Sequence, residues 1–238
     1  MVIKAVPTAP TLADVKIQQQ KCFRLINSKY PPQSVFDDVA DADEFDALFA
    51  LQALTNPRLK AMAGNLSLLP SRDIPFGIAG CSYAVAPFTH VSPAGSRFSD
   101  GRFGVLYLAD TLKAAISEVA YHQNKYWSKV PELAYERFVF RALSCEFCDV
   151  TLADLTVLPS TDAIYAKEDY AAAQTLGLKL RGSGSAGVQY HSVRSSGAVC
   201  WGLFSPRYVT QMVQSAHYEM IWQNGGISAI NKIISCSE

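Results

Sequence analysis

A short apolar run that leads directly into a helix-forming segment constrains the fold of this chain more than any other sequence feature. Val105–Ala109 is a compact β-prone run, and Asp110 and Thr111 follow it with side chains that can accept backbone amide hydrogens at a helix start. From there to about His122, apolar residues recur at positions i, i+3, i+4 and i+7. The pattern predicts a strand followed at once by an amphipathic helix whose apolar stripe faces the core.

This expected helix carries one acidic residue at the border of its apolar stripe. At about 100° per residue, Glu118 lies beside the small side chains of Ala114 and Ala115, with His122 one turn further along. Two interpretations are open from the helix alone. Glu118 is either a carboxylate that projects into a cleft or an ordinary boundary residue at a solvated edge.

The rest of the chain mixes strand-like and helix-like patterns. The expected strands are Cys22–Ile26, Ile78–Ala86, Tyr135–Leu143 and Val150–Leu158, with a hairpin of Val188–Val193 and Val199–Phe204 across Arg194–Gly197. The expected helices are Asp43–Leu54, Leu59–Leu69 and Thr161–Leu176. Because no repeat or low-complexity linker divides the chain, the predicted fold class is α+β, a single mixed domain.

We expect three parts along the chain: an N-terminal arm over residues 1–20, a catalytic domain over 21–222 and a C-terminal tail over 223–238. The tail segment Gly225–Glu238 suits either a short amphipathic helix that meets a partner or a frayed terminus.

Charge and hydropathy exclude several classes of protein. The chain balances 21 basic against 21 acidic residues, so its net charge gives no sign of a phosphate-neutralising, nucleic-acid-binding surface. No segment approaches the roughly 18 uninterrupted apolar residues of a membrane span, and the N-terminus lacks the apolar stretch of a secretory signal. We therefore expect a cytoplasmic protein that binds neither membrane nor nucleic acid, with its six cysteines mostly as reduced, buried thiols.

Two further segments carry candidate ligand-binding residues. A loop rich in glycine and serine, Gly95–Gly101, presents Arg97, whose planar guanidinium suits a phosphate, and Arg102 is a competing candidate that we rank lower. Downstream, Ser192 lies among polar residues interleaved with an expected strand. Each residue also has an ordinary structural interpretation, as a surface arginine in a turn or a hydrogen-bonded serine in a strand.

Taken together, four blocks resemble the RES-domain family of bacterial toxins, which is named for an arginine, a glutamate and a serine. Arg97 with the following Phe98, then Tyr107, Glu118 and Ser192 stand at the matching positions, in the same order. The resemblance covers roughly residues 22–222 and is strongest from 95 to 122. Family members often carry an asparagine and prolines after the arginine–aromatic pair, where this chain has serine, aspartate and glycine. If the alignment slips near the hairpin, Ser195 or Ser196 takes the place of Ser192.

The resemblance implies an ADP-ribosyltransferase-like β core with flanking helices and an activity that consumes NAD+. Glu118 would stabilise the positive charge that develops on the ribose when the nicotinamide–ribose bond breaks. Arg97 would hold the pyrophosphate or an incoming phosphate. Tyr107 would stack on the nicotinamide or ribose, and Ser192 would hydrogen-bond the substrate. The expected catalytic residues are thus Arg97, Glu118 and Ser192, with Arg97, Tyr107 and Ser192 binding NAD+.

The acceptor of the ADP-ribosyl group stays open at this point. Water gives an NAD+ glycohydrolase, inorganic phosphate as co-substrate gives an NAD+ phosphorylase, and a side chain of a target gives a protein mono-ADP-ribosyltransferase. A catalytically silent nucleotide-binding module is the alternative from another class. The resemblance implies no metal and no cofactor besides NAD+ itself. It also implies a cognate Xre-type, helix-turn-helix antitoxin as partner, often in an assembly of several copies.

Two other motifs carry less weight. Gly182, Gly184 and Gly187 fit the spacing of a dinucleotide-binding fingerprint, but a β-like run follows where that motif needs a helix. Cys145 and Cys148 have the spacing of half a zinc site, without a second pair of ligands. His122 and His191 adjoin the expected site and are candidates to tune it.

Overall fold

Two long strands form the centre of the fold. The computed structural model describes residues 12–30, 36–37, 39, 41–53 and 63–234. In it, β1 (Ala13–Asn27) pairs antiparallel with β3 (Tyr135–Asp154) along nearly its whole length, and β6 (Val209–Gln223) pairs antiparallel with β3 as well. From Phe140 to Phe147, β3 has a partner on each side, so the sheet itself satisfies the backbone hydrogen bonds of this stretch.

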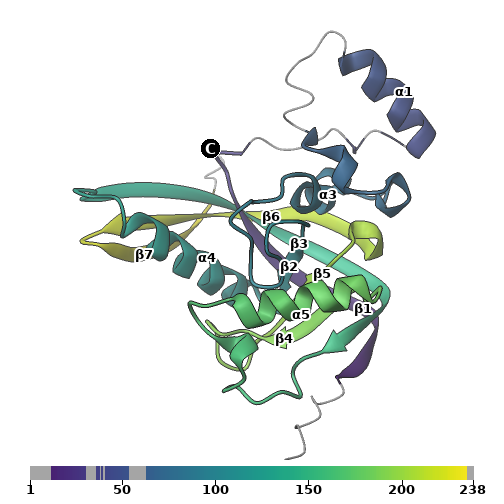
Figure 1. Ribbon diagram of the computed structural model, residues 1–238. Helices are drawn as coiled ribbons and strands as arrows, with labels where there is room; N and C mark the ends of the chain where they lie inside the picture. Colours follow the sequence, from purple (N-terminus) through teal and green to yellow (C-terminus); the bar gives the residue numbers. More distant parts are fainter. Residues whose placement is uncertain (1–11, 31–35, 38, 40, 54–62, 235–238) are drawn as a thin grey trace, which may run out of the picture.

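Around this centre the described residues form a seven-stranded mixed sheet in the order β1-β2-β5-β4-β3-β6-β7. The shorter strands are β2 (Leu106–Ala109), β4 (Gly187–His191), β5 (Val199–Leu203) and β7 (Gly226–Ile233). The β3–β4 pairing is parallel and the other pairings are antiparallel. Since β1 pairs with both β2 and β3, five strands close into a ring, and β6 and β7 extend from it as an arm (Figure 1).

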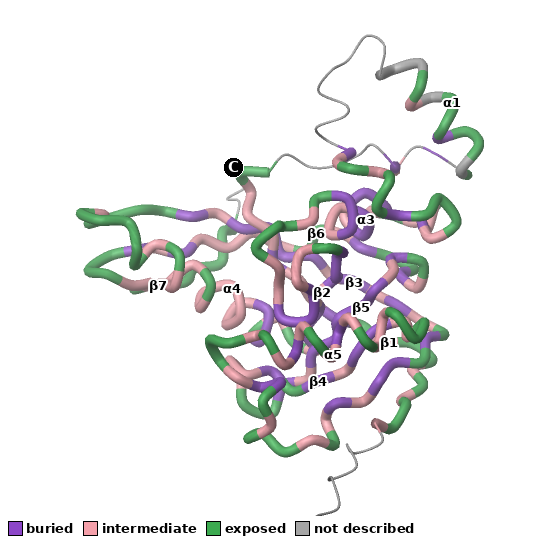
Figure 2. The backbone as a smooth tube through the Cα atoms, in the orientation of Figure 1, coloured by how far each residue is buried: buried purple, intermediate pink, exposed green. Residues whose placement is uncertain are grey.

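Helices cover the two faces of the sheet. Figure 1 shows α1 (Ala42–Ala53) and α3 (Cys81–Thr89) on one side, and α4 (Leu112–Trp127) and α5 (Ala171–Gly182) on the other. The core is correspondingly divided into two clusters. In β2, Leu106 and Leu108 join the cluster beneath α3, whereas Ala109 joins the cluster beneath α4, as the alternating pleat of a strand requires. The buried trace in Figure 2 runs through the sheet between these helices.

These observations confirm the predicted α+β class, a single mixed domain whose seven-stranded sheet is consistent with an ADP-ribosyltransferase-like core. The strand-to-helix junction is also confirmed as β2 followed by α4, with Thr111 as the residue that caps the helix. The hairpin is confirmed as the antiparallel pair β4 and β5. Strand Cys22–Ile26 is the C-terminal part of the longer β1, which begins inside the expected 1–20 arm.

The strand predictions for two regions differ from the observed structure. Ile78–Ala86 was predicted as a strand, which is wrong because α3 occupies this region. Gly80, with φ of 78°, precedes the helix, and Cys81, Ala84, Val85 and Phe88 are buried at helical spacing. The two strands predicted between residues 135 and 158 are one strand, β3. Pairing with β1 and β6 continues across the segment that seemed to separate them.

Two helix predictions need correction as well. Thr161–Leu176 holds a 3-10 turn at Ala163–Tyr165, and α5 begins only at Ala171. The C-terminal tail was predicted as a short helix or a frayed end, but Gly226–Ile233 is strand β7, which pairs with β6. The Asp43–Leu54 helix is confirmed as α1 over its described residues. In the Leu59–Leu69 segment, residues 59–62 lie outside the described part, and Leu66–Leu68 form a 3-10 turn.

The cysteines of the described residues are free thiols, and four of these five are buried. Burial raises the pKa of Cys81 and of Cys200 to about 12, which keeps both protonated near neutral pH. No helix in the described part combines the length and apolarity needed to cross a membrane.

The contact between α5 and the loop that carries Arg97 leaves no room for a side chain at Gly177. A Cβ there would lie 2.0 Å from the carbonyl oxygen of Phe98. We predict that Gly177→Ala destabilises the protein by about 1–3 kcal/mol despite the higher helix propensity of alanine. Urea unfolding measures this change.

The matched control is Gly182→Ala at the end of the same helix, where a Cβ meets nothing within 4 Å. It should leave stability unchanged or raise it by up to about 1 kcal/mol. Equal unfolding midpoints for the two variants would contradict the close packing at Gly177.

Candidate active site

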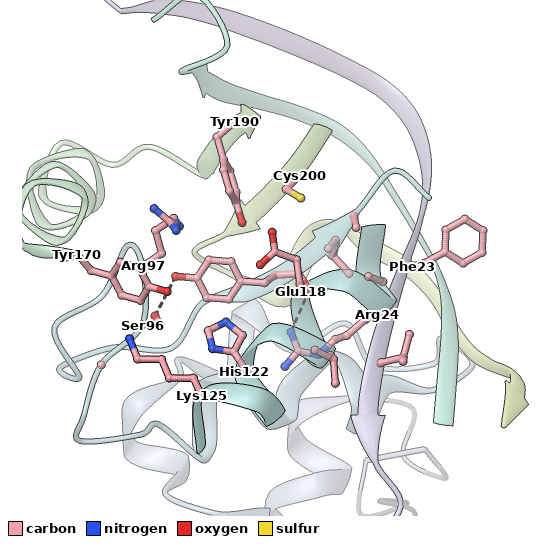
Figure 3. A pocket seen from close by; sticks show the side chains of 17 residues that line it. Phe23, Arg24, Ser96, Arg97, Glu118, His122, Lys125, Tyr170, Tyr190 and Cys200 are labelled. Atoms are coloured by element: carbon pink, nitrogen blue, oxygen red, sulfur yellow. Dashed lines mark hydrogen bonds between the residues drawn. The ribbon is translucent and has the colours of Figure 1, made fainter. Parts of the chain in front are cut away.

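The carboxylate of Glu118 lies in a cavity between α4, β1 and β2. Helix α4 is held at its start by Thr111, whose Oγ1 accepts a hydrogen bond from the Ala114 amide at 3.2 Å. Ala114 and Ala115 are buried and let the helix pack closely against the sheet, and Glu118 follows one turn later. Figure 3 shows the Glu118 side chain projecting into the cavity, with Tyr190 and Cys200 on the opposite side. Of the two interpretations, the structure therefore supports the carboxylate in a cleft.

Ser192 is in direct contact with this carboxylate. Its Oγ donates a hydrogen bond of 2.7 Å to Glu118 Oε1. The same oxygen accepts the backbone amides of Arg194 at 3.1 Å and Ser195 at 3.0 Å. A serine hydroxyl has one hydrogen and two lone pairs, so the two amides direct that hydrogen towards the glutamate. Ser192 thus contacts Glu118 and does not itself line the cavity.

Arg97 reaches the cavity from the glycine-rich loop. Its Nη1 donates to the carbonyl oxygens of Ile164 at 2.9 Å and Ala166 at 3.1 Å, and its guanidinium lies 4.5 Å from the centre of the Tyr170 ring. These carbonyls belong to the segment before α5 that was predicted as helical. Nε and Nη2 have no hydrogen bond to the described residues, so they are available to a ligand.

Tyr107 holds the Arg97 loop against the sheet. Its hydroxyl accepts the backbone amide of Phe98 at 2.8 Å and lies 2.9 Å from Ser96 Oγ. Burial raises the pKa of Tyr107 to about 12, although these two hydrogen bonds act in the opposite direction. The phenol is therefore neutral at physiological pH, and it binds the Phe98 backbone amide and the Ser96 side chain on either side of Arg97.

Arg24 is a site residue that the sequence reasoning missed. It lines the cavity from β1, and its Nη1 donates to the Tyr107 carbonyl oxygen at 3.0 Å (Figure 3). Desolvation lowers its pKa, and no carboxylate of the described residues forms a salt bridge with it. An arginine inside the apolar run Cys22–Ile26 was the available signal, because a charged group in a buried strand needs a partner.

The cavity has a volume of about 420 Å³ and is rich in positive charge. Arg24, Arg97 and Lys125 line it, and Glu118 is the one carboxylate in the described lining. This composition suits an anionic ligand with one carboxylate placed for chemistry.

His122 stands at the edge of the cavity, one helical turn beyond Glu118. Desolvation and the nearby cations, Arg194 first among them, lower its pKa, while the Glu118 carboxylate opposes them. His122 is therefore neutral at physiological pH. His191 is exposed and does not line the cavity.

The competing candidates lie elsewhere. Arg102 is exposed and pairs with Asp100 at 2.7 Å, and neither Ser195 nor Ser196 lines the cavity. The glycines at 182, 184 and 187 connect α5 to β4, the reverse of the strand-to-helix order of a dinucleotide fingerprint. Within the residues that the structure describes, no three His, Cys, Asp or Glu side chains are grouped as metal ligands.

Comparison with known proteins defines the class to which this fold and site belong. The model of the RES domain matches residues 74–223, which include Arg97, Tyr107, Glu118 and Ser192. The chain is a member of the RES-domain family.

The sequence identity to individual similar proteins is low. The chain is 26% identical over 214 residues to the uncharacterized protein y4oC of Sinorhizobium fredii, and the match covers 87% of this chain and 85% of that protein. Among solved structures, the MbcT–MbcA toxin-antitoxin complex of M. tuberculosis contains a chain similar to this one. That match has 13% identity and a TM-score of 0.47, and it covers 87% of each chain.

The position of the Arg97 loop should depend on the Tyr107 hydroxyl. We predict that Tyr107→Phe costs about 1–3 kcal/mol of stability, because the buried Phe98 amide loses its acceptor. Chemical denaturation measures the loss. The control is Tyr135→Phe, whose side chain is exposed and outside the cavity, and it should be neutral. A Tyr107→Phe protein as stable as the control would refute this role of the phenol.

Proposed function

We propose that this protein consumes NAD+ by cleaving the bond between nicotinamide and ribose. The observation that carries the proposal is the Glu118 carboxylate, oriented by Ser192 within a cavity whose other charged side chains are cationic. A cationic cavity favours the pyrophosphate of the dinucleotide, and a single carboxylate favours the positive charge of a glycosyl transition state.

Each residue then has a distinct part in the reaction. The C1′–N bond breaks, its electron pair moves to the nicotinamide ring nitrogen, and positive charge develops on the ribose. Glu118 Oε1 is held by Ser192, whereas Oε2 has no hydrogen bond to the described residues and faces the reacting sugar in this proposal. Arg97 and Arg24 bind the pyrophosphate at the phosphate next to the reacting ribose, through their free N–H groups.

Water or phosphate completes the reaction at C1′. Attack by water releases ADP-ribose, nicotinamide and one proton, which Glu118 can accept before it passes to solvent. Attack by inorganic phosphate gives the ADP-ribose phosphate ester, with the arginines positioned to hold the incoming anion. A side chain of a target protein as acceptor is the alternative, and it requires that protein in the assay. In this proposal, none of these reactions uses a cofactor besides NAD+.

The biological role that we propose is that of a toxin in the cytoplasm, which depletes NAD+ and is restrained by an Xre-type antitoxin protein. This role rests on the family resemblance. An assembly of several copies of the chain is part of the same proposal.

Replacement of Glu118 by Gln tests the chemistry directly. Glutamine keeps the shape and can still accept the Ser192 hydrogen bond, but it carries no charge. We expect the rate of NAD+ loss, followed by release of nicotinamide, to fall at least about 100-fold, with the fold unchanged by circular dichroism. Assays with and without phosphate, and with cell extract as a source of protein acceptors, identify the acceptor. Undiminished turnover by Glu118→Gln would end the proposal, and NAD+ that binds but stays intact would indicate a silent module.

Ser192 offers a test of carboxylate orientation. We predict that Ser192→Ala lowers kcat about 10-fold or more, because Glu118 loses the hydrogen bond that orients it. Ser192→Thr keeps the hydroxyl and should recover most of the rate. A difference between the alanine and threonine variants would show that the hydroxyl is needed, because loss of packing alone does not predict such a recovery. The idea fails if alanine and threonine at this position give equal rates.

A further inference from the structure

A second hollow adjoins the cavity of Glu118 and continues along α4. We call it the α4 groove; its volume is about 1140 Å³, and it is lined by the end of α4, the end of β1 and the start of β3. His122 and Lys125 line both the cavity and the groove, so the two spaces meet at these side chains. In Figure 3, His122 and Lys125 lie on the side of Glu118 away from Tyr190 and Cys200.

The groove carries positive charge. Lys29, Lys125, Lys129 and Arg137 line it, and no aspartate or glutamate does so among the described residues. Lys125 is paired with Glu168 at 2.5 Å and Arg137 with Glu219, but the Lys129 ammonium has no partner in the described part of the chain. An anionic group is therefore the ligand that this surface attracts.

Aromatic side chains lie among these cations. Tyr126 is 64% exposed, and its ring packs edge-on against Trp127, with ring centres 4.9 Å apart. Trp127 is itself fixed, because it stacks on Phe138 at 4.7 Å and donates to Gln123 at 2.9 Å. An exposed ring supported by fixed neighbours is a suitable platform for a planar base.

The spacing of these groups along α4 and the turn after it suits the length of a dinucleotide. Glu118, His122 and Lys125 are spaced by four and three residues, so they share one face of the helix. At 1.5 Å per residue, Lys125 lies about 10 Å beyond Glu118, and Tyr126 and Lys129 follow. A substrate with its glycosidic bond at Glu118 can thus extend along this face and place its distal half beside Tyr126 and Lys129.

We propose that the α4 groove binds the adenylate half of the substrate, with the purine stacked on Tyr126 and the adjacent phosphate contacted by Lys129. This proposal rests on the proposed function for its choice of a dinucleotide. The groove contributes affinity for the distal half of the substrate and leaves the chemistry at Glu118 unchanged. The protein then prefers NAD+ over nicotinamide mononucleotide, which lacks the adenylate.

The experiment compares these two substrates in the full-length protein. For Tyr126→Ala and Lys129→Ala, we expect kcat/KM for NAD+ to fall about 10-fold, while kcat/KM for nicotinamide mononucleotide stays within about twofold of the wild-type value. Matched controls are Tyr135→Ala, an exposed tyrosine of β3 outside the groove, and Lys113→Ala, an exposed lysine of α4 outside both hollows. Neither control variant should change kcat/KM for either substrate.

Binding of AMP, measured by calorimetry, tests the groove without relying on catalysis. We expect AMP to bind the wild-type protein and both controls equally, and to bind the Tyr126 and Lys129 variants about 10-fold more weakly. If the protein cleaves neither substrate but AMP binding behaves as expected, the proposed function fails and the groove assignment stands. The groove assignment is overturned if NAD+ is cleaved but the variants lower kcat/KM equally for both substrates. It is also overturned if the variants bind AMP as the wild type does.

Discussion

The hydrogen bond from Ser192 to Glu118 is the interaction on which the geometry of the site depends. It joins two residues 74 positions apart, one on a helix and one in the turn between β4 and β5. Two backbone amides of the turn donate to the serine oxygen and occupy both of its acceptor positions. The single hydroxyl hydrogen then donates to the carboxylate. The helix and the hairpin therefore have to be packed correctly before the carboxylate is oriented.

The loop that carries Arg97 is held from two sides, by the sheet and by α5, which gives the arginine a defined position. The Tyr107 hydroxyl binds the loop backbone from the sheet, α5 packs against it at Gly177, and Gln174 donates to the Ser96 carbonyl oxygen at 3.0 Å. One nitrogen of Arg97 is itself occupied by two backbone carbonyls. Such a fixed guanidinium loses little conformational entropy when it binds an anion.

Charge in this protein is separated in space although it cancels in total. The 21 basic and 21 acidic residues give a net charge of zero, yet the cavity and the α4 groove are lined mainly by cations. Glu168 and Glu219 line neither hollow, but they form salt bridges with the lining residues Lys125 and Arg137. The net charge of the whole chain therefore carried no information about this cationic cavity, and the expectation against nucleic acid as a partner stays a prediction.

Elements whose signals are local could be predicted from the sequence. Strand β2, the Thr111 cap, the apolar stripe of α4 and the β4–β5 hairpin depend on neighbouring residues, and the resemblance to the RES family added the candidate site residues on them. The remaining features depend on tertiary contacts. Arg24, Lys125 and the hydroxyl direction of Ser192 acquire their roles from contacts between distant segments, and two carbonyls of the segment before α5 bind Arg97. Periodicity records which face of an element is buried, but it carries no information about which distant partner completes a hydrogen bond.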